Sequence, residues 1–277
     1  MLTLAALSQL TACGKDDSAE NFEVFSVGDK TTITKYRGTS LVVNIPSTIE
    51  GRPVTEIGEK AFYQCTGLTE ITIPDSVKQI DHNAFGGCTG LTKVTIPNSV
   101  TEIGEKAFFG CESLTEVTIP DSVTKIGSSA FEDCTGLTDI TIPNSITEIG
   151  SSAFHSCLGL TEITIPDSVS KIGDSAFSNC LGLTKVNIQN GVNTIGLNAF
   201  TFCTGLTEIT IPNSVTSIDE GAFSSCTGLT KITIPDSVTN IGDSAFSNCT
   251  GLTEVNVPKG TVYSSTAFPA GCKITKY

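Results

Sequence analysis

Residues 160–182 read LTEITIPDSVSKIGDSAFSNCLG, and near copies of this unit follow one another along most of the chain. The copies begin at Leu68, Leu91, Leu114, Leu137, Leu183, Leu206, Leu229 and Leu252, so that nine units share a period of 23 residues. A single unit of this size cannot bury its apolar side alone, whereas stacked units bury a continuous core. The period therefore predicts a solenoid with one coil per unit.

The first half of each unit has the alternation of a short strand. Leu160, Ile163 and Ile165 are expected to point inward, because alternate side chains of a strand lie on the same face. Pro166 has no amide hydrogen to donate, so strand pairing should end there. The Asp-Ser pair that follows is expected to turn the chain.

The second half of the unit is expected to connect one strand to the next. Val169 and Ile172 again place apolar groups inward, Gly173 allows the backbone to change direction, and Phe177 and Cys180 complete the core. The Ala-Phe step suggests one turn of α-helix or 3₁₀-helix. The predicted fold is an α/β, strand-rich solenoid, with a parallel sheet of one short strand per repeat and short helical or 3₁₀ turns on the connecting side.

A period of 20 to 29 residues that opens with L-x-x-I-x-I is typical of leucine-rich repeats. The full unit, L-x-x-I-x-I-P-x-S-V-x-x-I-G-x-x-A-F-x-x-C-x-x, resembles the BspA-like (Treponema-type) leucine-rich repeat family over residues 41–272. The resemblance implies a surface protein of a bacterium or parasitic protist, and it implies adhesion to host matrix proteins or other cells. The period itself indicates only a solenoid.

Composition and charge narrow the classes of function. The chain has no Trp and one Met, and its 29 acidic and 16 basic residues give a formal net charge of -13. Such a charge repels a phosphate backbone, so nucleic acid is not expected as a partner. We expect a monomer that binds a protein or glycan ligand, such as a host matrix protein.

Eleven cysteines would ordinarily suggest a disulfide framework, but ten of them recur every 23 residues. These ten are Cys65, Cys88, Cys111, Cys134, Cys157, Cys180, Cys203, Cys226, Cys249 and Cys272. No C-x-x-C pair occurs, so we expect no metal site and no other cofactor. The predicted arrangement is a buried ladder of reduced thiols, although the ~4.8 Å strand spacing approaches the separation of a disulfide.

The first thirteen residues, MLTLAALSQLTAC, end in a segment that resembles a bacterial lipobox, with Cys13 as the lipidated residue. No Lys or Arg precedes Lys15, so the usual basic start of a signal peptide is missing. Residues 14–17 resemble the export signal of Bacteroidetes surface lipoproteins. We expect an outer-membrane lipoprotein on the cell surface that contacts the membrane only through its lipid. The alternative is an apolar N-terminal strand with a buried cysteine.

These patterns divide the chain into five segments. They are a lipoprotein signal segment (1–13), a tether (14–21), an N-terminal cap hairpin (22–40), the leucine-rich repeat array (41–257) and a C-terminal cap (258–277). Residues 47–53 make the first unit about five residues longer than the later ones. Residues 273–277 are expected to add an edge strand.

The outward positions of the strands form the candidate binding surface. One row is mainly charged: Glu70, Lys93, Glu116, Asp139, Glu162, Lys185, Glu208 and Lys231. The other is Thr-rich: Thr72, Thr95, Thr118, Thr141, Thr164, Asn187, Thr210 and Thr233. The two rows should line the inner face of the arc, which solenoids use for recognition. The alternative is a solvated face whose Thr and opposite charges only stabilise the sheet.

Four apolar residues depart from the consensus and could form an exposed apolar patch. Leu158 and Leu181 replace the Thr that follows Cys in many units, and Phe109 and Phe202 add a second aromatic residue near the first. An exposed cluster of this kind would favour association. Better packing of the loops is the alternative.

Catalysis has little support in the sequence. His82 and His155 have no evident partner, and neither a nucleophile elbow nor a Gly-rich phosphate loop occurs. We therefore expect a binding protein and not an enzyme. An envelope spacer without a ligand is the second hypothesis, a hydrolase is the third, and an ice-binding Thr array is a distant fourth.

Overall fold

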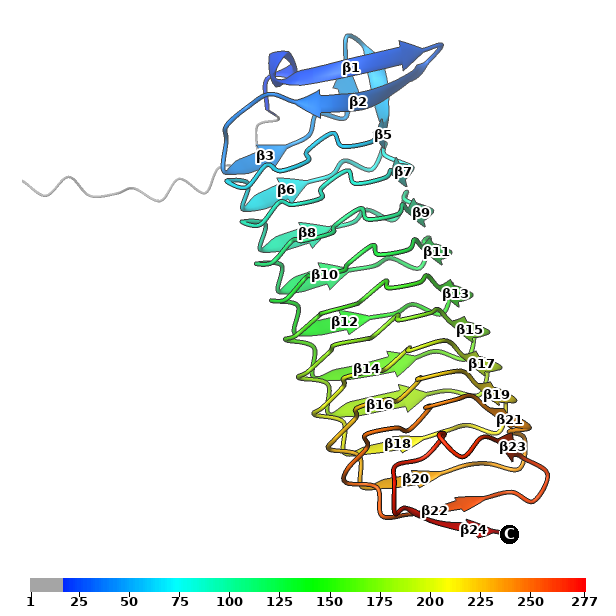
Figure 1. Cartoon of the computed structure of the whole chain (residues 1–277). Helices are drawn as coiled ribbons and strands as arrows, with labels where there is room; N and C mark the ends of the chain where they lie inside the picture. The colour runs from blue at the N-terminus through cyan, green and yellow to red at the C-terminus, as the bar shows by residue number, and fades with distance from the viewer. Residues whose placement is uncertain (1–16) are drawn as a thin grey trace, which may run out of the picture.

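The computed structural model describes residues 17–277, and the proposed lipidation site Cys13 lies outside them. The chain winds into a solenoid of about 11 turns with ~23 residues per turn, and the coils stack into an elongated array (Figure 1). This confirms the predicted leucine-rich repeat solenoid. The irregular first and last coils add to the nine regular units, so the array is longer than the regular repeats alone indicate.

One side of the solenoid carries the predicted parallel strands, one in each coil. They form two sheets, because strands β12 and β14 are not paired. The first sheet contains β3 (Val42–Asn44), β6 (Glu70–Thr72), β8 (Lys93–Thr95), β10 (Glu116–Thr118) and β12 (Asp139–Thr141). The second contains β14 (Glu162–Ile165), β16 (Lys185–Ile188), β18 (Glu208–Thr210), β20 (Lys231–Thr233), β22 (Glu254–Val257) and β24 (Lys273–Lys276). Strand β24 is the edge strand expected at residues 273–277.

A second side carries a thirteen-stranded sheet that the sequence did not predict. It begins with β1 (Phe22–Val27), β2 (Lys30–Tyr36), β4 (Thr48–Ile49) and β5 (Arg52–Ile57). The remaining strands are β7 (Gln79–Ile80), β9 (Glu102–Ile103), β11 (Lys125–Ile126), β13 (Glu148–Ile149), β15 (Lys171–Ile172), β17 (Thr194–Ile195), β19 (Ser217–Ile218), β21 (Asn240–Ile241) and β23 (Val262–Tyr263). Most of these strands are two residues long, which is too short for an alternating pattern to be recognised.

The connecting side consists of single turns with i to i−3 hydrogen bonds. In one coil the amide of Ala153 donates to Gly150 O (3.2 Å) and the amide of Cys157 donates to Phe154 O (3.3 Å). The intervening amide of Phe154 donates instead to Ala176 O of the next coil (2.8 Å). Ser152 adopts a φ of 54°, which interrupts any continuous helix. Within residues 17–277 the only helix is η1 (Ala19–Asn21), so the predicted helical turns are present only as isolated turns.

The core is a set of columns that run the length of the solenoid. In the coil that begins at Leu160, the side chains of Leu160, Ile163, Phe177 and Cys180 are at most 3% exposed. The phenylalanines stack from coil to coil; the Phe154 and Phe177 rings lie 5.2 Å apart with an interplanar angle of 10°. Each apolar side chain therefore lies over its counterpart in the preceding coil, as the period predicts.

Both ends of the aromatic column are covered. Strands β1 and β2 form an antiparallel hairpin, and β2 continues into the long sheet by parallel pairing with β5. Tyr36 stacks on Phe62 with ring centroids 5.1 Å apart, and Phe22 packs beside both rings. At the other end Tyr263 lies edge-on to Phe268. The extra residues of the first unit form a small β4–β5 hairpin.

Candidate functional site

The candidate binding face is the outward side of strands β6 to β20. Parallel pairing aligns equivalent residues of successive coils, for example Glu70 with Lys93 and Thr72 with Thr95. The side chains of both predicted rows are exposed, whereas the residue between them in each strand is buried. The structure therefore places the two rows beside each other on one face, with a break in strand pairing between β12 and β14.

The Thr-rich row differs from the threonines that support the fold. Thr92 and Thr115 directly precede Lys93 and Glu116 of the charged row. Their hydroxyls donate to backbone carbonyls of the preceding coil. Among residues 17–277, the hydroxyls of Thr72, Thr95, Thr118, Thr141, Thr164, Thr210 and Thr233 form no such bond and no bond to another side chain. This row offers donors and acceptors that the fold does not use.

The charged row is only partly paired. Lys93 Nζ lies 3.2 Å from Glu116 Oε2, and Lys185 Nζ lies 3.4 Å from Glu162 Oε2. These side chains are more than half exposed, so each pair contributes little to stability. Glu116 is directly opposite Asp139, and this like-charge pair is unfavourable for the sheet. The other paired neighbours of the row have opposite charges, so among these pairs stability alone fails to account only for Glu116–Asp139.

A groove runs beside the binding face, between the strand ends and the Pro-Asx turns. Its hollows measure about 540 Å³ beside β6 to β10, about 380 Å³ beside β12 and β14, and about 820 Å³ beside β16 to β20. The sequence did not single out this groove, because its walls come from turns that look like consensus framework. The hollow of about 820 Å³ is called the C-terminal groove below.

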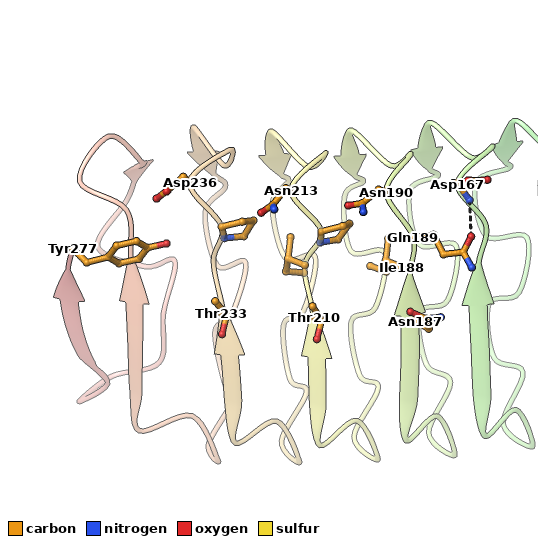
Figure 2. Close-up of a pocket in the computed structure, with 13 residues that line it drawn as sticks. Asp167, Asn187, Ile188, Gln189, Asn190, Thr210, Asn213, Thr233, Asp236 and Tyr277 are labelled. Atoms are coloured by element: carbon orange, nitrogen blue, oxygen red, sulfur yellow. Dashed lines mark hydrogen bonds between the residues drawn. The ribbon is translucent and has the colours of Figure 1, made fainter.

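Two rows of polar side chains line the C-terminal groove (Figure 2). The turn row is Asp167, Asn190, Asn213 and Asp236, and the strand row is Asn187, Thr210 and Thr233. The buried side chains of Ile188, Ile211, Pro212 and Pro235 form the floor. Tyr277 stands at one end and is 49% exposed. Its hydroxyl donates to Ile234 O (2.8 Å), which fixes the ring as an end wall.

One unit departs from the consensus at this groove. Gln189-Asn190-Gly191 replaces the usual Pro-Asx-Ser. Because Gln189 has an amide hydrogen, it donates to Ile165 O (3.0 Å), and its side-chain Oε1 accepts from Asp167 N (3.1 Å). A Cβ on Gly191 would lie 1.7 Å from Asp167 O, so only glycine fits there. This loss of the proline is the signal that could have located the groove from sequence.

The four apolar departures do not form one cluster. Leu158 and Leu181 occupy equivalent positions of adjacent coils and are 37% and 43% exposed. Phe202, in the next coil, is 52% exposed at a φ of 59°, a conformation that is unfavourable for an aromatic residue. Phe109 is half-buried and lies in an earlier coil.

The two histidines are far apart. His82 follows β7 and His155 follows β13, and strands β9 and β11 lie between these in the sheet. His82 Nε2 is 2.8 Å from the side-chain amide of Asn83, and His155 Nδ1 has no hydrogen-bond partner within residues 17–277. Among the described residues, neither histidine contacts a nucleophile and an acid in the arrangement that a catalytic triad needs.

The repeating cysteines form the expected column of thiols. All ten are free, and each internal thiol donates to the backbone carbonyl of a phenylalanine; the bond from Cys180 to Phe154 O is 3.2 Å long. Burial raises the pKa of Cys180 to about 12. Cys65 and Cys272 at the two ends are only half-buried. The thiols therefore belong to the core and not to a reactive site.

Residues 17–277 contain no group of three or more His, Cys, Asp or Glu side chains placed to bind a metal ion. The same residues include no helix with the length and apolar character of a bilayer-spanning segment.

The chain is similar to several known proteins. A model of the BspA type leucine rich repeat region matches residues 55–184 and 170–277. A leucine-rich repeat protein of T. pallidum is 34% identical with a TM-score of 0.66, over 70% of this chain and 92% of that one. A leucine-rich repeat protein of Eubacterium ventriosum shares the fold at 21% identity, with a TM-score of 0.53 and coverage of 90% and 92%. No curated protein matches the chain.

Proposed function

Because this chain belongs to the BspA-type leucine-rich repeat family, we propose that it is a cell-surface binding protein. Its strand face, which is the candidate binding face on the outward side of β6 to β20, attaches to a macromolecule of a host matrix or of another cell. The observation that carries this proposal is the exposed Thr-rich row on β6 to β20, whose Thr hydroxyls form no hydrogen bond within residues 17–277. Extended sheet faces of solenoids present such groups in a rigid array, so little entropy is lost when a ligand binds.

The chemistry of this face fits binding better than catalysis. Its exposed groups are hydroxyls and carboxylates interleaved with lysines, repeated from coil to coil. A repeated array gives many weak contacts, which suits an extended ligand, and it has no unique acid-base pair. The envelope spacer remains the second candidate, because an elongated array of stacked coils also holds two points apart (Figure 1).

The first test replaces the charged row on the strand face. A variant with Glu70, Lys93, Glu116 and Asp139 changed to Ala is expected to bind a panel of immobilised matrix proteins at least about tenfold more weakly than the unaltered chain, because each lost polar contact contributes about 0.5–1.5 kcal/mol. Surface plasmon resonance on the purified chain measures the change.

The matched control carries four Ala substitutions in the neighbouring sheet. Gln79, Glu102, Lys125 and Glu148 lie in β7, β9, β11 and β13 of the same coils. This variant is expected to bind as the unaltered chain does. Equal weakening by both variants would remove the strand face as the site, and absence of any saturable ligand would leave the spacer.

We further propose that Cys13 is lipidated and anchors the chain to the outer membrane with the array outside the cell. The support is the lipobox-like segment Leu10-Thr11-Ala12-Cys13 and the Gly14-Lys15-Asp16-Asp17 segment that follows it, which resembles the export signal of Bacteroidetes surface lipoproteins. Labelled palmitate is expected in the unaltered protein and absent from a Cys13→Ser variant. Protease added to intact cells should degrade the array of the unaltered protein; protection of the array would contradict surface exposure.

A further inference from the structure

We propose that the C-terminal groove binds a linear, uncharged oligosaccharide. This inference rests on the proposed function, because it names the class of ligand that the strand face and its groove would recognise. The hollow of about 820 Å³ falls within the ~300–1,000 Å³ that is usual for ligand sites. It is the largest of the three hollows along the groove beside the strands.

The lining of the groove matches the hydrogen-bonding capacity of sugars. Four side-chain amides line it, from Asn187, Gln189, Asn190 and Asn213, together with the hydroxyls of Thr210 and Thr233. Each amide both donates and accepts, and each sugar hydroxyl does the same. Asn187, Asn190, Asn213, Thr210 and Thr233 are exposed along the two rows of Figure 2. A polyhydroxylated chain can therefore bond to both rows at once.

The spacing of the rows favours a linear chain of sugars. Asp167, Asn190, Asn213 and Asp236 come from four successive coils, so their side chains repeat at the strand spacing of ~4.8 Å. This repeat is comparable to the length of one pyranose unit in an extended chain. An oligosaccharide lying across the coils would place about one sugar over each coil.

The groove is less suited to a peptide. Its apolar residues Ile188, Ile211 and Pro212 form a buried floor, so these residues offer no apolar pocket to a side chain of a bound peptide. The backbone groups of β16 and β18 are already paired with their neighbours in the sheet, so a peptide across the coils could not add a strand. A sugar chain needs neither an apolar pocket nor an unpaired strand edge, so the absence of both weakens its binding less than that of a peptide.

Charge excludes acidic sugars from the groove. Of the residues in the described part of the chain, Asp167 and Asp236 line it and no Lys, Arg or His does. Sulfated and sialylated chains would meet these carboxylates without a compensating cation, which is unfavourable. Tyr277 at the end of the groove presents a partly exposed ring against which the apolar face of a terminal sugar can pack.

The experiment uses an array of linear neutral oligosaccharides, namely β-1,4-glucans, xylans, mannans and poly-N-acetyllactosamine, beside sulfated and sialylated counterparts. The purified full chain is expected to bind at least one neutral series and none of the acidic ones. Binding to the neutral series should change little with added salt, because no ion pair is formed.

Variants then locate the site. The double variant Asn190→Ala/Asn213→Ala and the single variant Tyr277→Ala are each expected to weaken neutral-glycan binding about tenfold. Asn98→Ala is the matched control, since Asn98 follows Pro97 in the hollow beside β6 to β10 as Asn213 follows Pro212 in the C-terminal groove. It should leave binding unchanged. Circular dichroism checks that the variants are folded.

Three results would overturn the inference. They are no binding to any neutral oligosaccharide, binding confined to acidic glycans, or a loss of neutral-glycan binding by Asn98→Ala equal to that of the groove variants. A chain that fails on neutral glycans but binds deglycosylated matrix proteins through the charged row would refute this inference alone. A chain that binds neither sugars nor matrix proteins would refute the proposed function as well.

Discussion

Replacement of Phe154 by alanine is expected to lower the free energy of unfolding by about 3–5 kcal/mol, because a large cavity opens in the middle of the aromatic column. Phe154 is fully buried, and its ring stacks on Phe131 at 5.5 Å and on Phe177 at 5.2 Å. Both coil interfaces weaken together, so the two halves of the array lose part of their coupling. Urea unfolding followed by circular dichroism measures the change.

Phe202→Asn provides the control for this prediction. Phe202 is 52% exposed and has a positive φ, and Asn occupies the equivalent positions 179 and 248 with similar φ values. Loss of this ring should leave the stability unchanged or raise it by a few tenths of a kcal/mol, since Asn adopts this conformation more readily. Similar destabilisation by both variants would mean that the aromatic column is not the source of the stability.

The array is expected to lose stability steeply as the pH rises above about 8.5, where unfolded thiols begin to ionise. Burial raises the pKa values of Cys88, Cys111, Cys134, Cys157, Cys180 and Cys203. Their stabilising contribution is complete below the unfolded pKa and is lost as the pH rises toward the folded pKa. Each thiol contributes a slope of up to about 1.4 kcal/mol per pH unit, so six give up to about 8 kcal/mol per pH unit.

Urea titrations between pH 7 and pH 11 under reducing conditions measure this slope. The double variant Cys134→Ala/Cys180→Ala should flatten it by up to about 2.7 kcal/mol per pH unit, because two thiols no longer ionise on unfolding. Comparison of slopes, and not of absolute stabilities, separates ionisation from the small packing loss. An unchanged slope in this variant would assign the alkaline loss to other groups.

The repeat predicted the core well because its side chains have the same neighbours in every coil. Leu160, Ile163, Phe177 and Cys180 were all placed inward from the pattern alone, and each is buried. The second sheet was not predicted, because strands such as Lys171–Ile172 are too short to show a period. Its pairing depends on stacking between coils, which the pattern within a single unit does not describe.

The candidate site was predicted only where it repeats. The charged and Thr-rich rows follow from the period, and parallel pairing aligns them as expected. The C-terminal groove depends instead on one altered turn, at Gln189, and on Tyr277, which is 88 positions later in the chain. Two residues so distant in sequence come to line one groove only through the stacking of the coils, which the pattern of a single unit does not describe.

The in-register stacking of nearly identical coils also bears on how such a protein changes over time. Removal or duplication of one whole unit, such as residues 91–113, would join surfaces that are already complementary, since Val94 pairs with both Ile71 and Val117. Recombination between copies of the unit can therefore lengthen or shorten the molecule in single-unit steps. Both terminal caps and the unusual turn at Gln189 would pass unaltered through such events, so reach and recognition can evolve separately.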